Sequence, residues 1–127
     1  MSDLPENLRY TKDHEWARLE SDGTVTVGIT QHAVDQLGDI TAVSLPSAGD
    51  RLAAHDRFGD IDSVKAVSDL YAPIEGEVVA INGDLDRTPE SVNEDPYGKG
   101  WMIRIKPASA DALAGLLDAR AYADLIA

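Results

Sequence analysis

The chain has 127 residues, of which 43% are hydrophobic and 27% charged, and these values are ordinary for a single globular domain. Eleven basic and twenty-three acidic residues give a formal charge of -12, which repels phosphate backbones and anionic membranes, so we expect no nucleic acid or membrane partner. Because the chain has no cysteine, it can form no disulfide, thiolate nucleophile or cysteine-held metal site. We therefore expect one domain over residues 1–127, in which any sulfur redox chemistry belongs to an attached group.

The start of the chain shows no targeting segment. Residues 1–6 contain no basic region followed by an apolar run, they do not resemble an Arg-rich transit peptide, and no later apolar run approaches the length of a membrane span. These features predict a bacterial cytoplasmic protein, and a mature mitochondrial form is the less favoured alternative.

Alternating apolar residues predict a hairpin and a short helix in the first part of the chain. Residues 16–20 and 24–29 read as paired strands across a Ser-Asp-Gly turn, whose Gly can adopt positive φ. A helix near 31–37 follows, with Thr30 as its N-cap and Gly38 as the residue that ends it.

Short strands separated by Gly, Pro, Asn and Asp continue along the rest of the chain. The predicted strands are residues 40–45, residues 51–53, two short strands around a reversal within 57–67, a strand pair within 71–81, and residues 101–106. After Pro107 the apolar residues change from alternating to helical spacing, and Ser109 can cap a C-terminal helix near 110–126. The chain is therefore predicted to be mainly β with added helices.

Lys65 differs in its setting from the other three lysines of the chain. It lies between Val64 and Ala66, in the middle of the predicted reversal, whereas the other lysines stand beside charged residues, Gly or Pro. We expect Val64 and Val67 to be anchored in the core, so that the lysine side chain extends outward, where a modifying enzyme can reach its amine. Taken alone, this pattern is more typical of an ordinary exposed turn lysine than of a modified one.

No other residues form a pattern typical of catalysis or metal binding. His14, His32 and His55 lack the spacing of metal ligands, and structural or surface roles are expected for them. Trp16 and Trp101 lie on alternating strands and are predicted to be buried in the core. The sequence has no Gly-rich phosphate loop and no nucleophile elbow. We therefore predict no metal site and no catalytic residue.

Several sequence blocks stand in order along the chain. They are residues 10–16 (YTKDHEW), 27–30 (VGIT), 37–40 (LGDI), 62–73 (DSVKAVSDLYAP), 76–79 (GEVV), 92–98 (VNEDPYG) and 100–103 (GWMI). In this order and at this length they resemble the glycine cleavage system H protein family over nearly the whole chain. The resemblance implies a lipoyl-domain-like fold, a barrel-sandwich hybrid in which two small sheets enclose the core and the lipoyl lysine sits at a β-hairpin tip.

The resemblance assigns the modified residue and its recognition site. It implies that Lys65 carries lipoate covalently, as N6-lipoyllysine, and that Asp62, Ser63, Val64 and Ala66 form the site that lipoyl-attaching enzymes recognise. The family usually has Glu three residues before the lysine, and Asp62 keeps the charge of that residue with a shorter reach.

The resemblance also implies a monomeric carrier that is not itself a catalyst. A pyridoxal-phosphate-dependent glycine decarboxylase (P protein) would pass the aminomethyl group of glycine to the lipoyl group on Lys65, called the arm below. A tetrahydrofolate-dependent aminomethyltransferase (T protein) would then take the one-carbon unit. Dihydrolipoyl dehydrogenase (L protein) would then reoxidise the dithiol, with NAD as final acceptor. By resemblance Glu15 and Asp69, with Asp13 as a third candidate, hold the protonated amine of the loaded arm.

Other interpretations of Lys65 stay open at this point. A biotinyl carrier usually has Met on both sides of its lysine, where this chain has Val64 and Ala66. A lipoyl domain of an acyltransferase is shorter, usually has Asp before the lysine, and lacks the His-Glu-Trp block and the terminal helix. A Schiff-base catalyst would need a buried lysine, whereas a hairpin tip is exposed. An acidic interaction module with an unmodified lysine is the remaining alternative.

Overall fold

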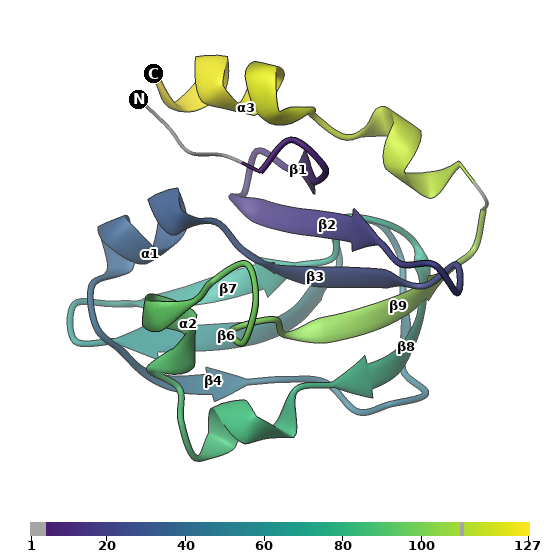
Figure 1. The fold of residues 1–127 in the computed structure, drawn as a ribbon. Coiled ribbons are helices and arrows are strands. Elements are labelled where there is room, and N and C mark those ends of the chain that lie inside the picture. The colour runs from purple at the N-terminus through teal and green to yellow at the C-terminus, as the bar shows by residue number, and fades with distance from the viewer. Residues whose placement is uncertain (1–4, 110) are drawn as a thin grey trace.

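The computed structural model describes residues 5–109 and 111–127, and the strands of this part of the chain form two antiparallel sheets (Figure 1). The larger sheet contains β1 (Arg9–Tyr10), β2 (Glu15–Leu19), β3 (Val25–Ile29), β5 (Arg51–Leu52), β8 (Gly76–Ile81) and β9 (Ile103–Pro107). Its strand order is β1-β2-β3-β9-β8-β5. The smaller sheet contains β4 (Ile40–Ser44), β6 (Arg57–Ser63) and β7 (Val67–Tyr71), in the order β4-β6-β7.

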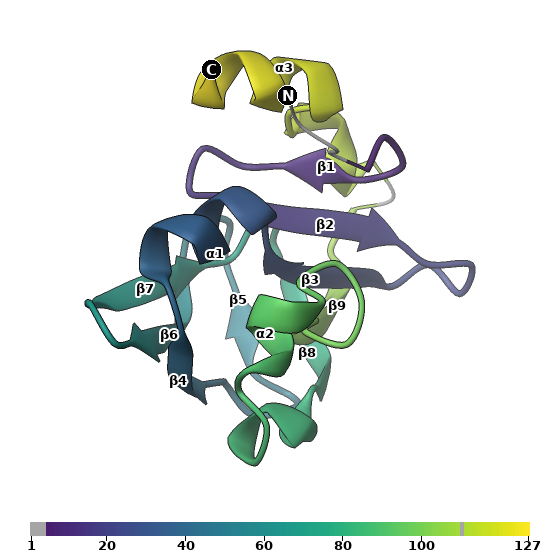
Figure 2. The same ribbon diagram turned by 60° about the vertical axis from the view of Figure 1, so that its left-hand side comes forward.

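Short helical segments lie between some of the strands and after the last one. Those in the described residues are α1 (Gln31–Leu37), the 3-10 turn η1 (Gly83–Asp86), α2 (Ser91–Glu94), the 3-10 turn η2 (Ala112–Gly115) and α3 (Ala119–Ile126). In both Figure 1 and Figure 2, α3 lies over β1 at one edge of the larger sheet. No helix in the described residues is long and apolar enough to cross a membrane. The predicted fold, mainly β with added helices, is confirmed.

The core consists of side chains from the inner faces of both sheets. Val27, Val78 and Ile105 of the larger sheet and Ile61 and Leu70 of the smaller sheet are 0–2% exposed. These residues alternate with outward-facing neighbours, as the period of two along a strand requires. Burial of each such side chain contributes roughly 1.5–3 kcal/mol, so the contact between the two sheets stabilises the fold.

The predicted helix at 31–37 is confirmed together with both of its ends. The Thr30 hydroxyl accepts a hydrogen bond from the N–H of Ala33 at 3.3 Å, and the N–H of Gly38 donates to the Val34 carbonyl at 2.9 Å. Gly38 has a φ of 76°, a left-handed value that a residue with a Cβ adopts only with strain. The helix therefore ends where the chain turns sharply toward β4, next to the β6–β7 hairpin.

The predicted C-terminal helix at 110–126 is wrong in its extent. Its first residue lies outside the described residues, and the next ones form only the turn η2 before α3 begins. Between η2 and α3, Leu117 pairs with Tyr10, and the N–H of each residue donates to the carbonyl of the other at 2.9 and 2.7 Å. Asp118 then caps α3 by accepting from the N–H of Ala121 at 2.8 Å. The backbone of Leu117 therefore pairs with the edge strand β1 and interrupts the helix that the spacing of the apolar residues predicts.

The strand pair predicted within 71–81 is also wrong. β7 and β8 belong to different sheets, because β7 pairs with β6 whereas β8 pairs with β5 and β9. Between them Ala72 and Ile74 are buried, and Pro73 has no N–H to donate to a strand partner. The segment therefore crosses from one sheet to the other. β8 begins at Gly76, where a Cβ would collide with the backbone of β9.

The two tryptophans differ in burial. Trp16 is fully buried as predicted, and its indole N–H donates to the Pro96 carbonyl at 2.9 Å. Its ring covers Gly28, where a Cβ would lie 2.7 Å from the indole. Trp101 is only half-buried, so its predicted place in the core is wrong, and the Arg104 guanidinium lies 5.5 Å from the centre of its ring.

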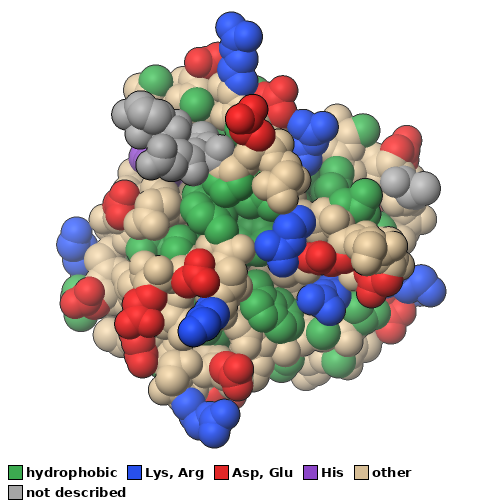
Figure 3. All heavy atoms as spheres, viewed as in Figure 1, with side chains coloured by type: hydrophobic (Ala, Val, Ile, Leu, Met, Phe, Trp, Pro, Cys, Tyr) green, Lys and Arg blue, Asp and Glu red, His purple; other side chains and the backbone are tan. Residues whose placement is uncertain are grey.

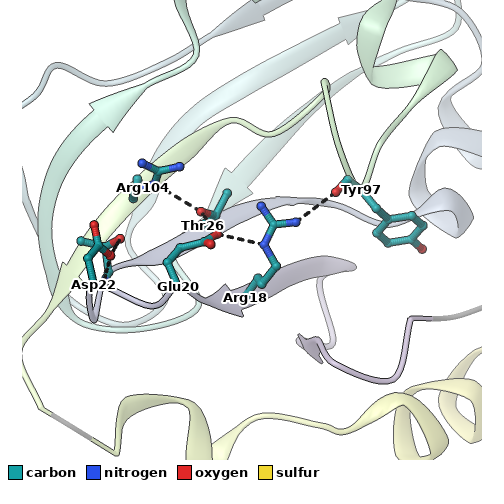
Figure 4. A network of polar contacts seen from close by, with 7 residues as sticks. Arg18, Glu20, Asp22, Thr26, Tyr97 and Arg104 are labelled. Carbon is teal, nitrogen blue, oxygen red and sulfur yellow. Dashed lines mark hydrogen bonds and ion pairs between the residues drawn. The ribbon is translucent and has the colours of Figure 1, made fainter.

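A network of polar side chains lies on the larger sheet (Figure 4). Arg18 donates to Glu20 at 2.9 Å, and the Thr26 hydroxyl donates to the same carboxylate oxygen at 2.6 Å. Arg104 of β9 donates in turn to the Thr26 hydroxyl at 3.3 Å. On the face of the molecule seen in Figure 3, acidic and basic side chains are interspersed around exposed apolar groups. The negative net charge is therefore not gathered into one continuous patch on that face.

Candidate functional site

The strands predicted around a reversal within 57–67 are present with shifted ends. β6 runs as one strand to Ser63 and β7 begins only at Val67, so the reversal lies between these two residues. The N–H of Ser63 donates to the Ala66 carbonyl at 2.9 Å and closes the turn. Lys65 therefore sits at the tip of a β-hairpin, and this tip projects from the side of the molecule beneath α1 in Figure 2.

The Ser63 side chain fixes the backbone of the tip. Its hydroxyl oxygen accepts hydrogen bonds from the N–H groups of Lys65 and Ala66, each at 3.2 Å, and the hydroxyl lies 3.3 Å from the Ala66 carbonyl, to which it donates. Serine side chains often satisfy the backbone of a turn in this way. The tip therefore has a defined backbone although its side chains are exposed.

Val64 and Val67 do not anchor the tip in the core, so that prediction is wrong. The two side chains are 66% and 68% exposed, whereas Ile61, further down β6, is fully buried. The hairpin extends past the end of the core, and solvent surrounds both valines. Lys65 therefore stands among exposed apolar side chains, and it makes no ion pair within the described part of the chain.

The stem of Lys65 lies against Gly38 at the end of α1. A Cβ placed on Gly38 would lie 3.4 Å from Cε of Lys65 and 3.7 Å from Cγ2 of Val64. The N–H of Val64 also donates to the Asp39 carbonyl at 3.0 Å. The end of α1 therefore holds the tip from one side, and the absence of a side chain at Gly38 leaves room for the aliphatic part of the lysine.

Glu15, at the start of β2, is buried with 1% exposure. The Thr11 hydroxyl donates to one of its carboxyl oxygens at 2.6 Å, and the N–H of Tyr71 donates to the other at 3.2 Å. Burial raises the pKa of Glu15 from its ordinary 4.5 to about 8, because the loss of water around the charged form outweighs these two hydrogen bonds. The carboxyl is therefore largely protonated near neutral pH. Neither hydrogen-bond donor was among the predicted site residues.

Asp69 and Asp13 lie in different surroundings. Asp69 is opposite Asp60 in the β6–β7 ladder, and Arg57 bridges the two carboxylates at 2.9 and 2.6 Å. Asp13 is exposed, and its N–H donates at 3.2 Å to the same threonine hydroxyl that donates to Glu15. Asp13 is therefore connected to Glu15 through its backbone N–H and Thr11. The Asp69 carboxylate accepts from Arg57 and also, at 3.5 Å, from the hydroxyl of Tyr71, the residue whose N–H donates to Glu15.

A polar cluster that the sequence did not predict joins α3 to the start of β2. The Nδ1 atom of His14 lies 2.8 Å from the Tyr122 hydroxyl, and the Thr30 hydroxyl lies 2.7 Å from the same oxygen. Burial lowers the pKa of His14, and the nearby His32 ring lowers it further. Only the position of His14 beside Glu15 gave a signal in the sequence, because Tyr122 comes from the other end of the chain.

A cavity of about 290 Å³ lies beside Asp13. Its wall includes Asp13, His55 and Thr11, the residue that donates to the Glu15 carboxyl. The cavity therefore provides space one hydrogen bond away from Glu15. In residues 5–109 and 111–127, no group of three or more His, Cys, Asp or Glu side chains is placed to hold a metal ion.

The chain matches known proteins over nearly its whole length. Residues 8–127 match the family model described as glycine cleavage H-protein. The chain belongs to the glycine cleavage H-protein family. It is 57% identical over 122 residues to the glycine cleavage system H protein of Psychrobacter sp. (strain PRwf-1), covering 96% of this chain and 97% of the relative. It is 54% identical over 127 residues to that of Halorhodospira halophila, covering 100% of this chain and 98% of the relative.

A solved structure of the H-protein family has the same fold. The crystal structure of a glycine cleavage system H protein from Mycobacterium marinum matches with a TM-score of 0.88 at 40% identity, covering 95% of this chain and 97% of that one. Two sheets around a shared core are therefore the architecture of this member as well, and the barrel-sandwich fold implied by the resemblance is confirmed.

The tip of the hairpin meets the requirements of the group that the family carries. H proteins carry lipoate on a lysine, and an amide bond to lipoate needs an accessible amine. Lys65 is exposed at a turn whose backbone Ser63 fixes. The exposed apolar side chains of Val64 and Val67 on either side leave the amine open to an enzyme. The residues present therefore fit the lipoyl group.

Proposed function

We propose that this member of the H-protein family is the lipoyl carrier of the glycine cleavage system and that it carries lipoate as an amide on Lys65. The observation that supports the proposal is the exposed position of Lys65 at the tip of a hairpin with a fixed backbone. The lipoyl group, when attached, supplies the reducible disulfide that the cysteine-free chain lacks. Amide formation also removes the positive charge of the lysine.

The residues around Lys65 suit recognition by a lipoyl-attaching enzyme. Val64 and Ala66 offer exposed apolar contacts on both sides of the amine, and Ser63 holds the turn in one conformation. Asp62 adds a negative charge at the last position of β6 that pairs with β7 before the turn. A substrate that is already ordered loses less conformational entropy when it binds, which favours a small recognition site of this kind.

The protein acts as a shuttle between enzymes and is not a catalyst. Its partners would be glycine decarboxylase, which would load the lipoyl group on Lys65 with the aminomethyl group of glycine, aminomethyltransferase, which would unload it, and dihydrolipoyl dehydrogenase, which would reoxidise it. A covalent tether keeps the carried group at high effective concentration near each docked enzyme. A single domain over residues 1–127, monomeric and placed in the bacterial cytoplasm, suits a carrier that must meet each partner in turn.

Glu15 is the proposed acceptor for the positive charge of the loaded arm. Its buried carboxyl has a pKa of about 8 and is largely neutral near pH 7. The positive charge of an incoming protonated amine would lower this pKa, so that the carboxyl would release its proton to solvent and pair with the amine as a carboxylate. Asp13 is a further acceptor, because its charge acts on the same carboxyl and helps to raise its pKa. Asp69 can contribute when its ion pair with Arg57 opens.

Reconstitution with the partner enzymes tests the carrier function. Together with glycine decarboxylase, aminomethyltransferase, dihydrolipoyl dehydrogenase, glycine, tetrahydrofolate and NAD, the lipoate-loaded chain is expected to support NADH formation. Lys65→Arg should abolish NADH formation, whereas Lys99→Arg, at an exposed lysine outside the hairpin, should retain it. NADH formation that persists with Lys65→Arg, or that never occurs with the wild-type chain, contradicts the proposal.

A further inference from the structure

Asn93 bonds to the short segment that joins α1 to β4. Its Oδ1 accepts a hydrogen bond from the N–H of Ile40 at 2.8 Å, and its Nδ2 donates to the Gly38 carbonyl at 2.9 Å. Asn93 belongs to α2 and is half-buried, and its two partners lie 53 and 55 residues earlier in the sequence. One side-chain amide therefore holds both ends of segment 38–40.

Segment 38–40 in turn holds the tip of the lysine hairpin. The Asp39 carbonyl accepts a hydrogen bond from the N–H of Val64 at 3.0 Å. The Lys65 stem lies beside Gly38, with Cε 3.4 Å from the position of a Cβ on that residue. The place of the tip relative to the body of the protein therefore depends on where segment 38–40 lies.

The segment needs a fixed point because its own backbone is irregular. Gly38 has a φ of 76° and a ψ of -151°, a combination that glycine adopts far more readily than other residues. The β4–β6 ladder also shifts register between Ile40 and Ala42, and such an irregularity leaves backbone groups without ladder partners. Asn93 supplies the acceptor for the N–H of Ile40 at this point.

We propose that Asn93 is a positioning residue for Lys65, because its amide sets the place from which the modified lysine leaves the body of the protein. The inference rests on the proposed function of Lys65 and adds a residue that acts through segment 38–40. Enzymatic reactions at a side chain require that it be presented in a defined geometry. Loss of the Asn93 amide should therefore slow lipoyl attachment without changing which lysine is modified.

Asn82 offers a matched control because it makes the same kind of contacts elsewhere. Its Nδ2 donates to the carbonyls of Lys99 and Trp101 at 2.9 and 2.8 Å, and its Oδ1 accepts from the N–H of Asp84 at 3.3 Å. These groups belong to the segments that follow β8 and precede β9. Asn82→Ala therefore removes a similar set of hydrogen bonds without removing a bond to segment 38–40.

The inference is tested with Asn93→Ala, Asn93→Asp and Asn82→Ala in the full chain. The measurements are the urea unfolding midpoint, native-state hydrogen exchange of the Val64 amide, and the initial rate at which a purified lipoyl-attaching enzyme modifies Lys65 with lipoate and ATP. Asn93→Ala should raise Val64 exchange about tenfold, as expected for the loss of a hydrogen bond, and slow attachment severalfold. Asn93→Asp keeps the acceptor for Ile40 and should lie between Asn93→Ala and the wild type.

The control separates positioning from a general loss of stability. Asn82→Ala should lower the unfolding midpoint while Val64 exchange and the attachment rate stay at wild-type values. Wild-type values of both in Asn93→Ala, or an equal slowing of attachment in Asn82→Ala, would overturn the inference. Absence of lipoyl transfer to the wild-type chain would contradict the proposed function instead, and Val64 exchange would still decide whether Asn93 positions the hairpin.

Discussion

The N–H of Tyr71 donates a hydrogen bond to the buried carboxyl of Glu15 at 3.2 Å and so joins the end of β7 to the start of β2. This contact ties the strand that leaves the lysine hairpin to the larger sheet. Because the carboxyl is only 1% exposed, its protonation is coupled to folding. The same group thus links the stability of the fold to the proposed site of the loaded arm.

Stability should therefore depend on pH through Glu15. Its pKa is about 8 in the folded protein against an ordinary 4.5, so the unfolded chain loses this proton first as the pH rises. The contribution of protonated Glu15 to the free energy of unfolding is fully present below about pH 4.5 and is lost as the pH rises to about 8. Between these two values the free energy of unfolding falls by up to about 1.4 kcal/mol per pH unit. Glu15→Gln should flatten this slope in urea unfolding, and Glu75→Gln, at an exposed position, should not. A wild-type slope in Glu15→Gln would contradict the assignment.

Gly38→Ala separates backbone strain from contact with the lysine. At a φ of 76° a Cβ is strained, and on Gly38 it would also lie 3.4 Å from Cε of Lys65. Gly23→Ala is the control, because Gly23 has a φ of 88° but nothing lies within 4 Å of its Cβ position. Both variants should lower the free energy of unfolding by about 1–3 kcal/mol. Only Gly38→Ala should also slow lipoyl attachment, and equal attachment rates in the two variants would show that the lysine stem does not need this space.

The exposed valines of the tip should matter little for stability. Val64→Ser and Val67→Ser should change the free energy of unfolding by no more than about 0.5 kcal/mol, because solvent already surrounds both side chains. Leu70→Ala, at a side chain that is 2% exposed, removes core contacts and should cost about 2–5 kcal/mol. Urea unfolding of the three variants measures these values. A loss of several kcal/mol in either valine variant would mean that the tip is anchored after all.

Two substitutions distinguish the proposed acceptors of the loaded arm. With Glu15→Gln the chain should lose its aminomethyl group faster than the wild type, because a neutral amide cannot balance the charge of a buried amine. With Asp69→Asn the acceleration should be smaller, because Asp69 is already paired with Arg57 at 2.9 Å. Mass spectrometry of the loaded chain over time measures both decay rates. Decay in Glu15→Gln no faster than in the wild type would remove Glu15 from this role.

The sequence predicted correctly those elements whose ends depend on neighbouring residues. The helix at 31–37 follows from an N-cap at Thr30 and a glycine at its end, and both form as predicted. The break before α3 depends instead on pairing between Leu117 and Tyr10, which are far apart in the sequence. Strand alternation showed which side chains face inward but not where the core ends, which is why Val64 was wrongly expected to be buried.

In the candidate site, too, the contacts between distant segments could not be predicted from the sequence. The family blocks contained Lys65, Glu15 and Asn93, so the resemblance led directly to the first two residues. Of the two donors to the Glu15 carboxyl, Thr11 lies four residues before it, whereas Tyr71 lies 56 residues after it, and no periodicity in the sequence relates Tyr71 to Glu15. The contacts of Asn93 with segment 38–40 likewise exist only once α2 packs against the end of α1.

The most direct test of lipoyl attachment is the intact mass of the chain purified from lipoate-replete bacterial cells, with fragment masses to locate the modified residue. Attachment at Lys65 predicts an increment of one lipoyl group on the wild type and on Lys99→Arg, and no increment on Lys65→Arg. An increment that persists in Lys65→Arg, an increment that corresponds to biotin, or an unmodified wild-type chain would contradict it.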